Sequence, residues 1–210
     1  MKNTKPLSYL LGSMYLAGII GLSFEKTEAF FQLITPFHLL SVCFFLIYTH
    51  EKINSRFQIF SLVISLLGYL IEVAGVNTGL IFGHYTYLTT LGPNVFGTPP
   101  MIGINWFIMI YTTGMLVLSL QIENIYLKSA LGAAFMTLFD LIAEPVAIAQ
   151  NMWNWQNDTP PVQNYVAWFL ISFVLLLYFF KQNFQTPNRL AKTVWIYQWL
   201  FFGILFLKLI

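Results

Sequence analysis

Charged side chains are scarce in this sequence. Only 9% of the 210 residues are Asp, Glu, Lys or Arg, whereas soluble domains usually carry about 25%. Hydrophobic residues make up 58% of the chain and aromatic residues 18%. Apolar runs of about 20 residues, the length that crosses the hydrocarbon core of a bilayer, leave no stretch for a separate soluble domain. The composition therefore predicts one integral membrane domain over residues 1–210.

Cysteine and the common cofactor motifs are also missing. The single cysteine, Cys43, excludes an internal disulfide and a cysteine-based metal cluster. Phosphate-loop, dinucleotide and zinc-protease motifs are absent. A retinal-binding seven-helix protein needs a lysine inside its last helix, whereas Lys208 is two residues from the C-terminus. We therefore expect no cofactor and no metal.

Seven hydrophobic stretches predict an all-α, polytopic membrane helix bundle with about seven transmembrane helices. Their predicted ranges are 7–24, 29–48, 57–76, 100–120, 125–148, 163–181 and 193–210. The fifth can also end early, at Pro145, because proline interrupts helices. The first stretch has no small-residue cleavage site of the signal-peptide kind, so we expect it to remain in the mature protein.

The basic residues separate onto two sides of this bundle. The side of the N-terminus receives eight of them, Lys2, Lys5, Lys52, Arg56, Lys128, Lys181, Arg189 and Lys192. The other side receives only Lys26 and Lys208. Because short loops rich in Lys and Arg stay in the cytoplasm, we expect a cytoplasmic N-terminus in a multi-pass protein of the cell (inner) membrane. The net charge of +2 reflects this topology and does not indicate a nucleic-acid partner.

Three carboxylates interrupt the predicted spans. Glu72, Asp140 and Glu144 fall near helix ends that emerge on the same, non-cytoplasmic side. An ionisable group inside a span costs about 2.5–3.5 kcal/mol on insertion scales, so it indicates a functional site. The alternative for each acid is a structural hydrogen bond between helices, and one member of the Asp140 and Glu144 pair can merely tune the other.

The helix faces that carry these acids are small and polar. Residues recur on them at steps of three and four, as Ser65, Gly68, Glu72, Gly75 and Gly79 and as Ala133, Thr137, Asp140, Glu144 and Ala147. Small residues allow helices to approach closely, so we expect the acids to point into the bundle. Pro145 lacks the N–H that would bond the carbonyl of Leu141, which opens the helix beside Glu144.

Two long outer loops follow these helices, at about 77–99 and 149–162. The first carries no charge apart from the titratable His84 and is rich in Gly, Pro and aromatic residues, so we expect it to be ordered and half-buried. The loops contain an echo, Tyr85-Thr-Tyr87 after Glu72 and Trp153-Asn-Trp155 after Glu144, and internal repeats are common in membrane folds. An aromatic belt at the membrane interface is the alternative explanation for these rings.

Acids and aromatic rings at one apolar face suit protonation of an alkene. A carboxylic acid in a low dielectric holds its proton, and the resulting tertiary carbocation is stabilised by aromatic faces and by a remaining carboxylate. Water then adds to the cation. This hypothesis assigns catalytic roles to Glu72, Asp140, Glu144 and His84. It assigns substrate binding to Asn77, Tyr85, Tyr87, Asn105, Trp106 and Trp153. The alternative to a proton-handling role for His38 and His84 is a structural one, in which each ring is a hydrogen-bonded polar side chain.

Several motifs resemble those of a known family. They are Glu72-Val-Ala-Gly-Val-Asn-Thr-Gly79, Phe82-Gly-His-Tyr-Thr-Tyr87, Leu91-Gly-Pro93, Gly97-Thr-Pro99, Asn105-Trp106 and, further along, Asp140-Leu-Ile-Ala-Glu-Pro145 with Trp153-Asn-Trp155. The sequence is similar, over roughly residues 57–180, to the membrane carotenoid biosynthesis proteins, a family that includes carotenoid 1,2-hydratases and bisanhydrobacterioruberin hydratases.

The resemblance implies an enzyme of the hydro-lyase type. It would add water across the terminal carbon–carbon double bond of an acyclic carotenoid end and form a tertiary alcohol, with the carotenoid taken from membrane lipid. Because the family is distantly similar to small membrane lycopene cyclases, one alternative enzyme quenches the same cation by cyclisation. A further alternative is a non-catalytic membrane protein that binds a carotenoid or another isoprenoid lipid.

Overall fold

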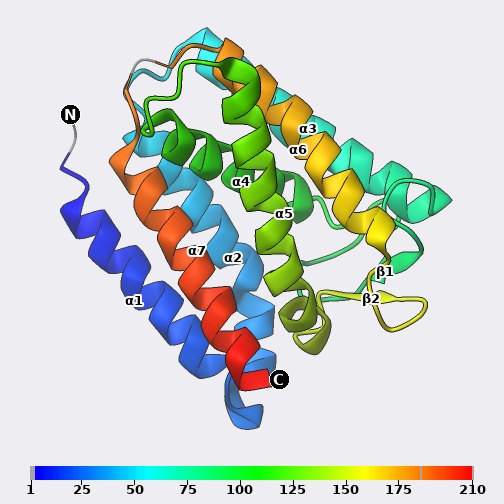
Figure 1. The fold of residues 1–210 in the computed structure, drawn as a ribbon. Helices are drawn as coiled ribbons and strands as arrows, with labels where there is room; N and C mark the ends of the chain where they lie inside the picture. Colours follow the sequence, from blue (N-terminus) through cyan, green and yellow to red (C-terminus); the bar gives the residue numbers. More distant parts are fainter. Residues whose placement is uncertain (1–2, 185, 210) are drawn as a thin grey trace.

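The computed structural model describes residues 3–184 and 186–209. This part of the chain forms seven helices and two short strands (Figure 1). They are α1 (Lys5–Gly21), α2 (Glu25–Thr49), α3 (Ser55–Thr78), β1 (Tyr85–Tyr87), α4 (Met101–Leu118), α5 (Ile125–Ala149), β2 (Trp153–Trp155), α6 (Val162–Lys181) and α7 (Arg189–Leu209).

The predicted all-α, polytopic bundle is confirmed. Each predicted span corresponds to one helix, and six of the helices are long and apolar enough to cross a membrane. The remaining helix, α1, has 17 residues. α5 does not end at Pro145 but continues to Ala149, with the proline inside the helix.

Local sequence explains several helix ends. The side chain of Asn54 accepts a hydrogen bond from the Phe57 N–H at the start of α3, and Asn124 caps α5 in the same way through the Tyr126 and Leu127 N–H groups. α3 ends at Gly79, whose φ of +67° lies in the left-handed region that glycine adopts without strain. The chain turns there into the first outer loop.

The helices form two groups around a central helix. α1, α2 and α7 lie side by side, and α3 and α6 lie on the opposite side of the molecule (Figure 1). α4 packs against α2, α3, α5, α6 and α7 and is the most buried of the six membrane-length helices. Residues from both groups can therefore face a shared space next to α4 and α5.

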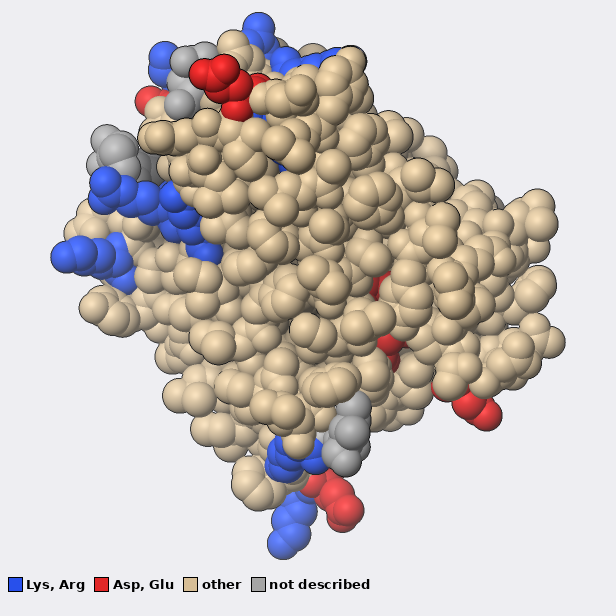
Figure 2. All heavy atoms as spheres, viewed as in Figure 1, with Lys and Arg blue, Asp and Glu red and all other residues tan. Residues whose placement is uncertain are grey.

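The surface of the bundle matches a multi-pass membrane protein. Figure 2 shows charged atoms mainly at the ends of the molecule and, between them, a broad band in which few charged atoms are visible. Large apolar side chains of the membrane-length helices are exposed, for example Leu33 of α2 at 71% and Leu62 of α3 at 67%. Such a surface is stable against lipid and would be unfavourable in water.

The two outer loops meet in an antiparallel ribbon. Tyr85 pairs with Trp155, Thr86 with Asn154 and Tyr87 with Trp153. Backbone hydrogen bonds on both sides extend the pairing, from Leu88 N–H to Met152 O at 2.9 Å and from Gln156 N–H to His84 O at 3.0 Å. The first loop is half-buried as expected, since Phe82, Tyr85, Tyr87 and Leu91 are buried. The ribbon thus places the two echoed aromatic segments beside each other.

Candidate active site

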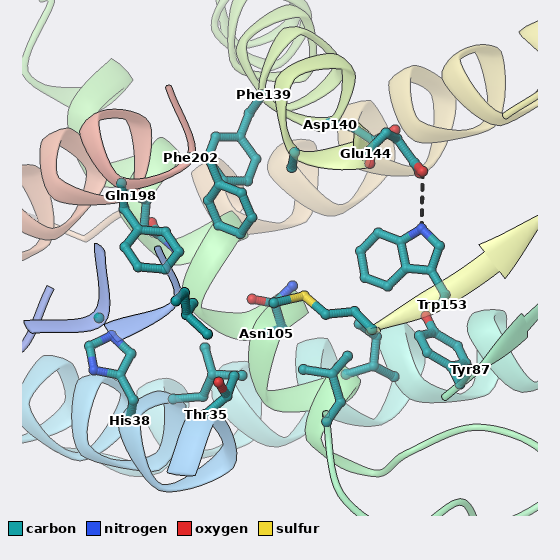
Figure 3. A pocket seen from close by; sticks show the side chains of 18 of the residues that line it. Thr35, His38, Tyr87, Asn105, Phe139, Asp140, Glu144, Trp153, Gln198 and Phe202 are labelled. Atoms are coloured by element: carbon teal, nitrogen blue, oxygen red, sulfur yellow. Dashed lines mark hydrogen bonds between the residues drawn. The ribbon is translucent and has the colours of Figure 1, made fainter. Parts of the chain in front are cut away.

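A cavity of about 340 Å³ lies between the helix groups, and every helix and both strands contribute to its wall. Its lining is mainly apolar, with the acids Glu72, Asp140 and Glu144 as the charged groups among the described residues. In Figure 3, Asp140 and Glu144 lie at one end with Trp153 and Tyr87. The prediction that the acids point into the bundle therefore agrees with the geometry.

Glu72 is held by three hydrogen-bond donors. Tyr85 and Tyr87 both donate their hydroxyl protons to Oε2, the latter at 2.8 Å, and Trp106 Nε1 donates to Oε1 at 2.9 Å. Burial, together with the nearby negative charge of Glu72, raises the pKa values of Tyr85 and Tyr87 well above the usual range. Both phenols therefore remain donors, and Glu72 is surrounded by groups that suit an ionised carboxylate.

Glu144 has similar hydrogen-bond donors at only one of its two carboxylate oxygens. Trp153 Nε1 and Trp155 Nε1 both donate to its Oε2 atom, at 3.0 Å and 2.8 Å. An indole N–H is a donor and never an acceptor, so this oxygen is fixed as an acceptor. The other oxygen, Oε1, has no hydrogen-bond partner among the described residues. It is the part of this carboxylate that is available to a ligand.

Asp140 lies one helical turn before Glu144 and has a different partner. Its Oδ2 atom accepts a hydrogen bond from Asn164 Nδ2 of α6 at 2.7 Å, and both side chains are 2% exposed. A side-chain amide has a donor end and an acceptor end. By rotating, Asn164 can pair with Asp140 in either protonation state, which the indoles around Glu144 cannot do.

The acids are held by a repeated arrangement. α3 carries Glu72 and β1 supplies two aromatic donors to it, while α5 carries Glu144 and β2 again supplies two. The next helix also supplies a donor, but to a different acid in the second case: Trp106 of α4 donates to Glu72, whereas Asn164 of α6 donates to Asp140. The echo in the loop sequences therefore corresponds to equivalent contacts in space.

Most of the predicted binding residues lie at this site. Tyr85, Tyr87, Trp153 and the half-buried Asn105 line the cavity. Trp106 contacts Glu72 and stacks on the cavity residue Trp168, with ring centroids 4.6 Å apart.

Two predicted site residues lie elsewhere. His84 is exposed, and its ring fills the space above the Gly79 Cα, where an added Cβ would be 2.2 Å from it. Asn77 is also exposed and donates hydrogen bonds to Val73 O at 2.7 Å and Phe96 O at 2.9 Å. Neither side chain lines the cavity. Both lie where α3 passes into the first outer loop.

Sequence reasoning missed several polar residues of the cavity, among them Tyr15, Asn164 and Gln198. The signal that identified the acids, a polar side chain inside an apolar run, also applies to Gln198. Asn164 stands near the start of its helix, where polar residues are common, and Tyr15 is an aromatic residue in the middle of a predicted span. Within the described residues, no three His, Cys, Asp or Glu side chains gather closely enough to hold a metal ion.

Comparisons with known proteins agree with the motifs of the sequence. A family model described as "Carotenoid biosynthesis protein" matches residues 33–210. Bisanhydrobacterioruberin hydratase of Haloarcula japonica is 31% identical over 136 residues, which cover 60% of this chain and 46% of that protein. The match thus spans about half the length of that relative. No solved structure matches the chain significantly.

Proposed function

Because the chain belongs to the carotenoid biosynthesis protein family, we propose that it hydrates the terminal carbon–carbon double bond of an acyclic carotenoid end. The product would be a tertiary alcohol. One observation carries the proposal: three buried acids meet in an apolar cavity, and their hydrogen-bond partners differ in a way that suits different roles. The name of the Haloarcula japonica relative, a hydratase, supports the same reaction type.

The cavity suits the end of a long apolar chain. Its volume of about 340 Å³ is at the lower end of the range of ligand pockets, roughly 300–1,000 Å³. It would therefore hold one end of the polyene while the rest stays outside in lipid. Burial of the acids in this wall keeps bulk water from the reacting carbon atoms.

Asp140 is the proton donor in this mechanism, because its partner Asn164 can accept from the protonated acid. The proton passes to the less substituted carbon of the terminal double bond, and the π electrons form the new C–H bond. A tertiary carbocation remains on the other carbon, and Asp140 becomes a carboxylate. General acid catalysis of this kind typically contributes about 10²–10⁴-fold.

Glu72 stabilises the cation. Three donors fix its orientation and favour its ionised form, so little reorganisation is needed when the positive charge forms. The rings of Tyr87 and Trp153 line the same end of the cavity and would add cation–π attraction.

Glu144 completes the addition of water. Its Oε2 atom is occupied by two indoles, which leaves Oε1 to orient a water molecule. The water oxygen forms the new C–O bond, and one of its protons passes to Glu144. Return of that proton to Asp140, one turn away on α5, restores the starting state. The net change is the addition of one water molecule to one double bond.

The reaction is tested in a host membrane that accumulates an acyclic carotenoid such as lycopene. We expect a more polar product with one added water for each modified end, and growth in ¹⁸O-labelled water should place the label in the new hydroxyl. An unlabelled hydroxyl would exclude hydration. A product of unchanged mass would instead support cyclisation, and bound but unconverted carotenoid would support a binding protein.

A further inference from the structure

The cavity has a second polar end, away from the acids. In Figure 3, His38 and Gln198 lie on the side opposite to Glu144 and Trp153, with Asn105 between the two sides. Tyr15 of α1 joins this end, since its ring contacts that of His38 edge-on with centroids 4.6 Å apart. The two ends are thus built by different helices, α1, α2 and α7 here and α3, α5 and α6 at the acids.

The polar groups at this end lack full hydrogen bonding. Among the described residues, the Tyr15 hydroxyl, the His38 ring nitrogens and the Asn105 amide make no hydrogen bond, although Tyr15 is only 7% exposed. Gln198 is 5% exposed and has only contacts of 3.5 Å, with Met109 Sδ and Thr112 Oγ1. Buried polar groups in folded proteins are nearly always paired. Several unpaired ones that face the same cavity point to a bound ligand.

The chemistry of this end selects the ligand. A phenol, an imidazole and two carboxamides offer both donors and acceptors, and among the described residues the charged groups of the cavity wall are the three acids at the other end. A phosphate or carboxylate would need a cation to compensate its desolvation. A neutral oxygen that both donates and accepts, such as a hydroxyl, fits these groups.

We propose that the end formed by Tyr15, His38 and Gln198 is a subsite for a neutral hydroxyl. The hydroxyl belongs either to the isoprenoid chain itself or to a water molecule. The inference rests on the proposed function for the identity of the chain, and it adds a specificity-determining site remote from the reacting double bond. One hydrogen bond contributes about 0.5–1.5 kcal/mol, so an alcohol should bind roughly 2–12-fold more tightly than the matching hydrocarbon.

The test measures binding separately from turnover. Affinities of the full-length protein in detergent are compared for geranylgeraniol and for the C20 isoprenoid hydrocarbon of the same skeleton. We expect the wild type to prefer the alcohol, and Tyr15→Phe and Gln198→Leu to bind both probes alike. Thr35→Val is the matched control, because Thr35 lines the same end but its hydroxyl already donates to Phe31 O at 2.9 Å.

The two sources of the hydroxyl give different results. If a water molecule occupies the subsite, the wild type shows no preference for the alcohol, but Tyr15→Phe and Gln198→Leu slow the hydration of a pure hydrocarbon substrate while Thr35→Val does not. The proposal is overturned if the wild type has no preference and neither variant changes turnover. A wild type that prefers the alcohol but converts no carotenoid would contradict the hydration hypothesis and would still support the subsite.

Discussion

Tyr85 and Trp155 face each other in the ribbon and hold two different acids. Their ring centroids lie 4.9 Å apart, and Tyr85 donates to Glu72 while Trp155 donates to Glu144. The positions of the two carboxylates are therefore linked through one pair of rings. A change in either ring is expected to disturb both acids.

Conversion of each acid to its amide should separate chemistry from folding. In Glu72→Gln, Asp140→Asn and Glu144→Gln, an amide oxygen can still accept from the indole or amide partner, so we expect normal accumulation in the membrane. Asp140→Asn and Glu144→Gln remove proton transfer and should lower turnover by about 10²–10⁴-fold. The measurement is the initial rate of hydration per folded protein. Near-parental rates in all three variants would contradict the carboxylate mechanism.

The two indoles that hold Glu144 should differ in their effect on stability. Trp155→Phe removes a donor from a buried position, 3% exposed, whereas Trp153 is half-buried. Loss of a hydrogen bond to a charged group costs about 1.5–3 kcal/mol, so Trp155→Phe should lower the unfolding temperature in detergent more than Trp153→Phe. Trp195→Phe is the control, because the Trp195 ring contacts those of Phe135 and Trp199 and its indole N–H makes no hydrogen bond among the described residues. Equal effects of Trp155→Phe and Trp195→Phe would argue against a supporting role of the hydrogen bond.

His50 should make the fold sensitive to acid. It follows α2, stacks on Phe57 at 3.7 Å, and its Nδ1 lies 2.7 Å from Tyr111 Oη. Because Asn188 donates to the same Oη atom at 3.0 Å, the Tyr111 hydroxyl donates to a neutral His50. Burial lowers the pKa of His50 from 6.5 to about 4, against the opposing charge of Glu51.

The sign of the pH effect follows from this lowered pKa. Between about pH 6.5 and pH 4, the unfolded state binds more protons at His50 than the folded state, so stability falls as the pH decreases through this window. His50→Gln should be less stable at pH 7 but should lose less stability on acidification. Unfolding temperatures in detergent at pH 7 and pH 5 test this. An unchanged difference between the two pH values would exclude His50 as the source.

The membrane topology is tested by cysteine labelling. In a Cys43→Ala background, cysteines at the exposed positions Thr89 and Asn157 should react with an impermeant thiol reagent from outside the cell, whereas one at the exposed Lys52 should not. The basis is the eight-to-two separation of Lys and Arg. Labelling of Lys52→Cys alone would reverse the orientation and place the acids near the cytoplasmic face.

The fold was largely predictable because its signals are local. Span length and composition identified the helices, and the small residues around Glu72 and Glu144 predicted that the acids face inward. The site was only partly predictable, because its contacts join residues far apart in the sequence. Nothing near Asp140 indicates Asn164 as its partner. His84 shares a loop with Tyr85 and Tyr87, yet strand alternation directs it to the opposite face of the ribbon from them, where it is exposed.

The origin of the donors has a consequence for biogenesis. Glu72 receives two donors from the loop directly after its own helix, and so does Glu144. Each acid can therefore be paired within the segment that is being inserted, before the ribbon forms, which would offset the insertion cost of about 2.5–3.5 kcal/mol. Asp140 is the exception, since its partner Asn164 is on α6. α5 and α6 would then have to enter the membrane as a pair, so arrest of synthesis before α6 should leave α5 poorly inserted.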